Sequence, residues 1–178
     1  MLRTSALLGL LSLAVATTTV AQTQPHLYGR YENIRLDQLG KTLKAKMDTG
    51  AMTASLSARD IERFERDGED WVRFRLAIEG MDDTLYEQPM VRISQIKTRA
   101  EERSDPEDDT DIERGADMAE RPVIEMELCI GDRLIETEVN LTDRSRFTYP
   151  LLVGATALRQ LDAAVYSTQK YTAGRPDC

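Results

Sequence analysis

The sequence predicts a compact β-barrel or β-sandwich with little helix. Several runs alternate between apolar and polar residues, turn-forming residues separate them at regular intervals, and few segments have helical spacing. The chain has 178 residues, enough for one ordinary domain. Hydrophobic residues make up 41% and charged residues 30%, which is typical of a globular protein.

The first strands are predicted to form a hairpin that leads into an aspartate. Residues 28–36 and 43–47 alternate on either side of a turn at residues 37–40. Asp48 follows directly, and Asp-Thr-Gly ends the strand in a tight turn. We expect Gly50 to adopt backbone angles that are closed to other residues.

A short helix is predicted over residues 58–66. Ser57 and Asp60 have the spacing of a helix capping box, with aspartate in place of the usual glutamate. Ile61 and Phe64 then lie three residues apart, as on one helix face. Asp-Gly at 67–68 is expected to end this helix.

Two extended segments follow, at residues 71–78 and 84–96, with a turn at Glu79–Asp83 between them. Pro89 lacks a backbone N–H, so the second segment is predicted to be an edge strand. A hairpin across Gly131-Asp132 is predicted to join strands at residues 123–130 and 134–141. An apolar run at residues 149–154, a short helix at 155–161 and a last strand at 164–168 follow.

The segment from residue 98 to about residue 120 differs in composition. Residues 101–113 contain eight acids and one arginine, and almost no apolar side chain. Because this composition cannot bury a core, we expect a disordered, solvated insertion. It is interpreted as a surface insertion, and a lid or a decoy for a cationic partner is the alternative.

The N-terminus has the pattern of a secretory signal peptide at residues 1–21. Arg3 precedes an apolar run at residues 7–16, and small residues lie before the expected cleavage point. The run is short for a membrane span, so no stable membrane anchor is expected, although a retained anchor is the alternative. These features predict a periplasmic protein with a single domain at residues 22–178.

Charge and rare residues restrict the partners. The net charge is −8, and it becomes −8 − 1 = −9 without the signal segment, which argues against nucleic acid and anionic membranes as partners. Cys129 and Cys178 could form a disulfide in an oxidising compartment; a buried Cys129 and a free C-terminal thiol are the alternative. His26 is the only histidine and no zinc-site spacing is present, so no metal or cofactor is predicted.

The strongest indication of function is Asp-Thr-Gly-Ala at residues 48–51, with Leu-Leu-Val-Gly at 151–154 about one hundred residues later. Together with residues 140–145 and 149–150, these motifs resemble the bacterial retropepsin-like aspartic endopeptidases. That family was formerly labelled "ATP-dependent zinc protease" and is associated with ATP-grasp glutamate ligases. The resemblance covers residues 27–170 apart from the acidic segment.

This resemblance implies a mainly β fold, a closed acid-protease-like barrel with one or two short helices. It implies an aspartic endopeptidase that hydrolyses a peptide or protein substrate with activated water, with a functional link to an ATP-grasp ligase. Asp48 is the implied catalytic residue. The supporting residues would be Thr49, Gly50, Ala51 and Thr53, and the substrate-binding residues Asp143, Arg144 and Gly154.

Acid-protease chemistry needs two carboxylates that share a proton, whereas this chain has one Asp-Thr-Gly. A homodimer would supply a second Asp48 across a two-fold axis. Alternatively, Asp143 and Arg144 would complete a one-chain site. The turn at Glu79–Asp83 is expected to act as a flap over an extended peptide.

One position departs from the family pattern. Ala155 stands where the resemblance implies an arginine that supports the site and the dimer, and Arg144 and Arg159 are the candidates to replace it. The alternative function is therefore a non-catalytic periplasmic peptide-binding or regulatory module that retains the barrel. In that case, Asp48 would only cap its own turn.

Overall fold

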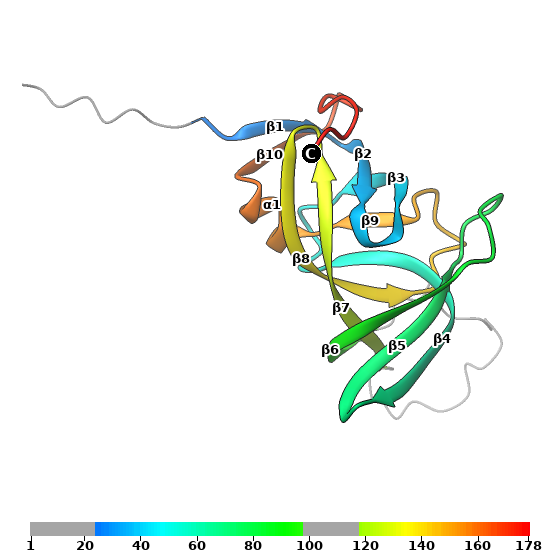
Figure 1. Ribbon diagram of the computed structural model, residues 1–178. Helices are drawn as coiled ribbons and strands as arrows, with labels where there is room; N and C mark the ends of the chain where they lie inside the picture. Colours follow the sequence, from blue (N-terminus) through cyan, green and yellow to red (C-terminus); the bar gives the residue numbers. More distant parts are fainter. Residues whose placement is uncertain (1–23, 98–117) are drawn as a thin grey trace, which may run out of the picture.

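A computed structural model describes residues 24–97 and 118–178. They form a mainly β fold with one short α-helix (Figure 1). The strands are β1 (His26–Gly29), β2 (Tyr31–Leu36), β3 (Lys41–Met47), β4 (Ala54–Arg66), β5 (Glu69–Leu76), β6 (Leu85–Lys97), β7 (Met118–Ile130), β8 (Arg133–Thr142), β9 (Leu151–Val153) and β10 (Ala163–Tyr166); the helices are η1 (Asp37–Leu39) and α1 (Ala155–Gln160).

Eight of these strands form one mixed sheet that closes into a ring. Their order is β2-β3-β9-β4-β5-β6-β7-β8, and extra pairings of β2 with β7 and of β4 with β8 close it. β1 and β10 form a separate parallel pair. The predicted mainly β, closed barrel is therefore confirmed, and Figure 1 shows the long strands β4 to β7 extending beyond the part formed by β2, β3 and β9.

The period-two patterns place one face of each strand in the core. In β3, Leu43, Ala45 and Met47 are buried while the residues between them are exposed. In β5, Val72 and Phe74 are fully buried. The predicted hairpin across residues 37–40 is also confirmed, with the turn closed by η1 and by a glycine in the left-handed region.

The predicted helix over residues 58–66 is wrong, because these residues belong to β4. A β-bulge lies between Arg59 and Glu62, which changes the face to which the following side chains point. Ile61 therefore packs against the core, whereas Phe64 pairs with Trp71. The two apolar residues three apart therefore belong to a bulged strand and not to one face of a helix.

Asp67 and Gly68 end no helix but form the two-residue turn between β4 and β5. Both have positive φ, 55° and 81°, as a tight hairpin of the Asp-Gly type requires. The two strands pair in antiparallel fashion from this turn to Leu76.

Contrary to the prediction, β6 is not an edge strand of the sheet as a whole, but Pro89 itself pairs with β5 alone. Residues 85–89 pair with β5, and residues 90–97 pair with β7. Pro89 lies where the first ladder ends and the second begins, so its missing N–H interrupts neither ladder in its middle. Residues 118–120, expected in the acidic insertion, belong to β7, while 98–117 and the signal segment lie outside the described residues.

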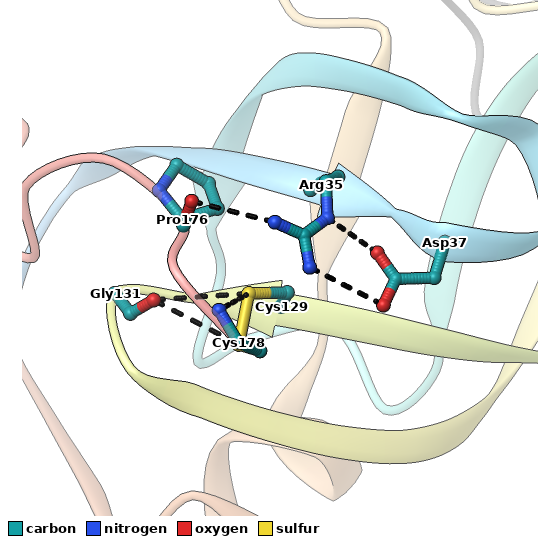
Figure 2. The surroundings of a disulfide bond; sticks show 6 residues. All are labelled: Arg35, Asp37, Cys129, Gly131, Pro176 and Cys178. Atoms are coloured by element: carbon teal, nitrogen blue, oxygen red, sulfur yellow. Dashed lines mark hydrogen bonds and ion pairs between the residues drawn. A yellow bond between two sulfur atoms is a disulfide. The ribbon is translucent and has the colours of Figure 1, made fainter.

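The C-terminal tail is fixed to the barrel by a disulfide between Cys129 and Cys178, which decides between the two alternatives for the cysteines (Figure 2). Arg35 pairs with Asp37 and donates to the carbonyl of Pro176 beside it. In the chain-entropy model, a bridge across a loop of this length stabilises the fold by about 4 kcal/mol. No helix in the described parts of the chain is both long and apolar enough to span a bilayer.

Ion pairs hold the turn between β5 and β6 against the barrel. The ammonium of Lys41 donates to Asp82 at 2.5 Å, and Asp83 pairs with Arg59 and Arg75. The hydrogen bonds from Lys41 and from the Thr84 hydroxyl lower the pKa of Asp82 to about 2.

Substituting Lys41→Ala is expected to raise the pKa of Asp82 toward its ordinary value of 3.8, because the largest cause of its lowering is lost. A lowered folded-state pKa stabilises the fold above about pH 4, and this contribution disappears as the pH falls through about 2. NMR titration of the carboxyl carbon measures it, with the exposed Lys44→Ala as control. An Asp82 pKa that Lys41→Ala leaves unchanged would contradict the ion pair.

Candidate active site

Asp48 lies directly after β3 and borders a cavity of about 670 Å³. Its carboxylate accepts the N–H of Gly50 at 3.0 Å and lies 3.0 Å from the ammonium nitrogen of Lys46. Its own N–H donates to the carbonyl of Val153 at 2.9 Å, which continues the parallel pairing of β3 with β9. The side chain is 22% exposed, so it is held in place and still open to the cavity.

The loop after Asp48 packs against the junction of β9 and α1. The N–H of Ala155 donates to the carbonyl of Ala51 at 2.7 Å. A Cβ atom on Gly154 would lie only 2.5 Å from the carbonyl oxygen of Thr53. The two motifs found far apart in the sequence thus meet backbone to backbone, which requires a residue without a side chain at this position.

Gly50 does not adopt the left-handed conformation that was expected of it. Its N–H binds the carboxylate of Asp48, and an added Cβ would meet Asp48 Oδ1 at 3.4 Å, an ordinary contact. The important feature of Gly50 is therefore its N–H and not its conformational freedom.

A buried asparagine supports the following residues. Asn140 on β8 is 2% exposed, and its amide donates to the hydroxyl of Thr53 at 3.1 Å and to the carbonyl of Ala54 at 2.8 Å. Its side-chain oxygen accepts a hydrogen bond from Ser55 at 2.9 Å. This network fixes the first residues of β4 beside the cavity.

Arg144 and Asp143 separate in the structure. Arg144 is 7% exposed and borders the Asp48 cavity; its N–H donates to the Ser57 hydroxyl at 3.0 Å and its guanidinium lies over Phe147. Asp143 borders a second cavity of about 280 Å³, and its carboxylate accepts the N–H of Ser145. The cavity that holds Asp48 therefore contains Arg144 without Asp143.

The two candidates for the missing arginine also differ. Arg144 borders the cavity, whereas Arg159 is exposed on α1 and binds the hydroxyl of Thr156 at 3.2 Å. Of the two, Arg144 is the one in a position to act near Asp48.

Among the described residues, the charged groups around this cavity are one carboxylate and three cations. Lys46 is half-exposed, while Arg121 on β7 is 7% exposed, as buried as Arg144. The chain carries a net charge of −8. The described residues around the cavity therefore carry more cations than carboxylates, in a protein that is acidic as a whole.

One wall of the cavity is aromatic. Tyr31 on β2 stacks on Tyr149 with ring centroids 4.1 Å apart. The phenols of Tyr31 and of Tyr171, in the C-terminal tail, interact with the Tyr149 phenol. Partial burial raises the pKa of Tyr149, and the two neighbouring phenols raise it further.

Five of the eight predicted site residues border the Asp48 cavity; Thr49, Gly154 and Asp143 do not, and Asp143 borders the second cavity. Those that border the Asp48 cavity are Asp48, Gly50, Ala51, Thr53 and Arg144. Thr49 is exposed next to it, and Gly154 is buried under the loop, so Gly154 acts on packing and not on a ligand. The neighbours that sequence reasoning missed are Tyr31, Lys46, Arg121, Asn140 and Tyr149; only Asn140 and Tyr149 lay in segments that carried the resemblance.

The expected flap at Glu79–Asp83 does not border the cavity, because ion pairs hold this turn elsewhere. Residues 94–96 of β6 border it instead, next to Arg121 of β7. In the residues that the structure describes, no group of three or more His, Cys, Asp or Glu side chains could hold a metal ion.

A closed β ring with an Asp-Thr-Gly loop facing a cavity is the architecture of the acid-protease class. The chain belongs to the RimB-like family, described as retropepsin-like aspartic endopeptidase RimB, whose model matches residues 27–176.

A crystal structure of a Legionella pneumophila protein of unknown function (DUF785) is similar, with 32% identity and a TM-score of 0.64 over 83% of this chain and 97% of that one. A probable alpha-L-glutamate ligase of Shewanella halifaxensis is 30% identical over 65% of this chain, and one of Desulfotalea psychrophila is 28% identical over 74%. The chain spans about a quarter of the length of these ligases, 23% and 26% respectively.

Substituting Gly154→Ala is expected to lower the free energy of unfolding by roughly 2–3 kcal/mol, because the new Cβ would force the Thr53 backbone to move. Gly50→Ala is the matched control and is expected to cost no more than about 0.5 kcal/mol. Urea denaturation followed by circular dichroism measures both. Equal stability of the two variants would show that the two loops do not pack as described.

Proposed function

We propose that this protein is an exported aspartic endopeptidase that cleaves acidic peptides, with Asp48 as the acid and base. The observation that carries the proposal is the Asp48 carboxylate, held by the Gly50 N–H and Lys46 at a 670 Å³ cavity in a member of this family. Export is included because of the signal-peptide pattern at residues 1–21.

In the proposed mechanism, two copies of the chain bring two Asp48 carboxylates together. Two carboxylates about 3 Å apart cannot both be charged, so they share one proton. The ionised Asp48 takes a proton from a bound water, which attacks the peptide carbonyl, and the protonated Asp48 polarises that carbonyl. Thr49 is exposed beside Asp48, so its hydroxyl is available to brace the same loop of the second copy.

The charge of the cavity supports an acidic substrate. Lys46, Arg121 and Arg144 border the cavity, and a guanidinium binds a carboxylate through two parallel hydrogen bonds. The relatives named as probable alpha-L-glutamate ligases carry a similar segment, which supports a functional link to ligation of glutamate. A peptide extended by glutamates would present carboxylates to the side of the cavity that these cations border.

Asp48→Asn is expected to lower the rate of peptide cleavage by about 10² to 10⁴, because it removes the acid–base group. Mass spectrometry of a synthetic glutamate-rich peptide measures cleavage, with Asp143→Asn as the control that keeps near-normal activity. Specific activity should also rise with protein concentration in the range where sedimentation shows dimers. Cleavage that survives Asp48→Asn would remove the proposal, and peptide binding without cleavage by the natural chain would favour the binding module.

Arg121→Gln is expected to raise KM about tenfold for a glutamate-rich peptide and to change it little for the glutamine counterpart, because a charge-assisted hydrogen bond is lost. Steady-state kinetics on both peptides provide the comparison. Arg92→Gln is the control, since Arg92 pairs with Glu138 on the exposed surface and does not border the cavity. An equal effect on both peptides would contradict recognition of substrate carboxylates.

A further inference from the structure

The C-terminal segment at residues 169–178, here called the C-terminal strap, is fixed at its far end to β7. Cys178 is bonded to Cys129, and the N–H of Asp177 donates to the carbonyl of Gly131 at 2.6 Å. Arg35 of β2 donates to the carbonyl of Pro176 (Figure 2). The end of the chain is therefore attached to the ends of both strands.

A buried carboxylate fixes the middle of the strap. Glu32 on β2 is fully buried and accepts hydrogen bonds from the N–H of Gly29, the N–H and hydroxyl of Thr172 and the N–H of Ala173, at 2.6, 3.0, 2.7 and 3.1 Å. Because all of these donors belong to the strap or to β1, Glu32 joins the strap to the barrel.

The near end of the strap reaches the cavity wall. The N–H of Tyr171 donates to the carbonyl of Tyr31 at 2.7 Å. Tyr31 in turn stacks on Tyr149, and the Tyr171 phenol interacts with the Tyr149 phenol. Tyr171 has φ of 55°, a conformation that a residue with a side chain adopts only when its surroundings impose it. Tyr31 is the ladder partner of Lys46, whose ammonium binds Asp48. A short series of contacts thus joins the strap to the candidate catalytic carboxylate.

We propose that the strap positions the Tyr31–Tyr149 wall of the cavity through Tyr171, and that the Cys129–Cys178 disulfide makes peptide binding depend on oxidation. The proposal rests on the proposed function, because the cavity wall concerned is that of the peptide site. Tyr171 is a positioning residue, since it acts through Tyr31 and Tyr149. The chain would bind peptide weakly while its cysteines are reduced and gain affinity when they are oxidised, as after export.

The reversible step is an exchange with a dithiol reductant. A thiolate of the reductant attacks the sulfur of the exposed Cys178, and Cys129 leaves as a thiolate that takes up a proton. The second thiol of the reductant then closes its own disulfide and releases Cys178 as a thiol. Two electrons and two protons pass from the reductant to the protein, and the reverse reaction restores the bridge.

Hydrogen–deuterium exchange on the oxidised and the reduced protein tests the proposal without any need for catalysis. We expect reduction to speed exchange in the strap and also in residues 28–34 and 146–152, which carry Tyr31 and Tyr149. An increase confined to the strap and the end of β7 would overturn the proposal, because the bridge would then stabilise only its own surroundings. This result is obtained whether or not the protein cleaves peptides.

Kinetics on the glutamate-rich peptide provide the second test. Tyr171→Phe is expected to raise KM about fivefold, because the polar contact of its phenol with Tyr149 is lost, with little change in kcat. Reduction of the natural protein should raise KM at least about fivefold. Reduction of the Tyr171→Phe variant should raise its KM less than about twofold further, because reduction and the substitution act through the same contact. Tyr166→Phe on β10 is the control without effect.

Fully additive effects of reduction and Tyr171→Phe would overturn the proposed route, as would a lower kcat at unchanged KM. If the natural protein cleaves nothing while reduction still speeds exchange around Tyr149, the proposed function fails but the positioning by the strap stands.

Discussion

The cavity depends on the contact between the loop after Asp48 and the turn at Gly154. Val153 accepts the N–H of Asp48, and Ala51 accepts the N–H of Ala155, so main-chain groups hold both sides of the loop. Because the contact is made by main-chain atoms, replacement of an arginine by Ala155 leaves it intact. What an arginine at position 155 would add lies beyond this contact, in the surroundings of the carboxylate and, in the proposed dimer, between the two copies.

Regular ladders were predictable from the sequence and irregular ones were not. The strands β3 and β5 alternate without interruption, so their core residues could be identified in advance. The bulge near Asp60 interrupts the alternation of inward and outward side chains in β4. The spacing of Ile61 and Phe64 therefore resembled that of a helix. The Asp48 loop was predictable because its chemistry is local, and Lys46, two residues earlier on β3, belongs to the same local arrangement although it was interpreted only as part of the strand's exposed face. Arg121 enters the site through the pairing of β6 with β7.

The net charge is a sum over the whole chain, so it does not reveal the group of cations near Asp48. An excess of acids correctly describes the chain as a whole, yet the described residues around Asp48 include three cations. The guanidinium of the buried Arg144 lies over the Phe147 ring, and its main-chain N–H donates to Ser57. A local field of this kind follows from burial and position, which composition does not contain.

The same cations bear on how two copies could share one catalytic centre. Bringing two Asp48 carboxylates together costs free energy, because like charges repel strongly in a partly desolvated site. Lys46, which already binds Asp48 in each copy, offsets part of that cost. Met52 and Phe147 are exposed at the border of the cavity, 64% and 38%, so a second copy or a bound peptide would bury apolar surface there. In the proposed dimer, lysine pairing and apolar burial around Asp48 thus supply stabilisation that an arginine at position 155 would otherwise contribute.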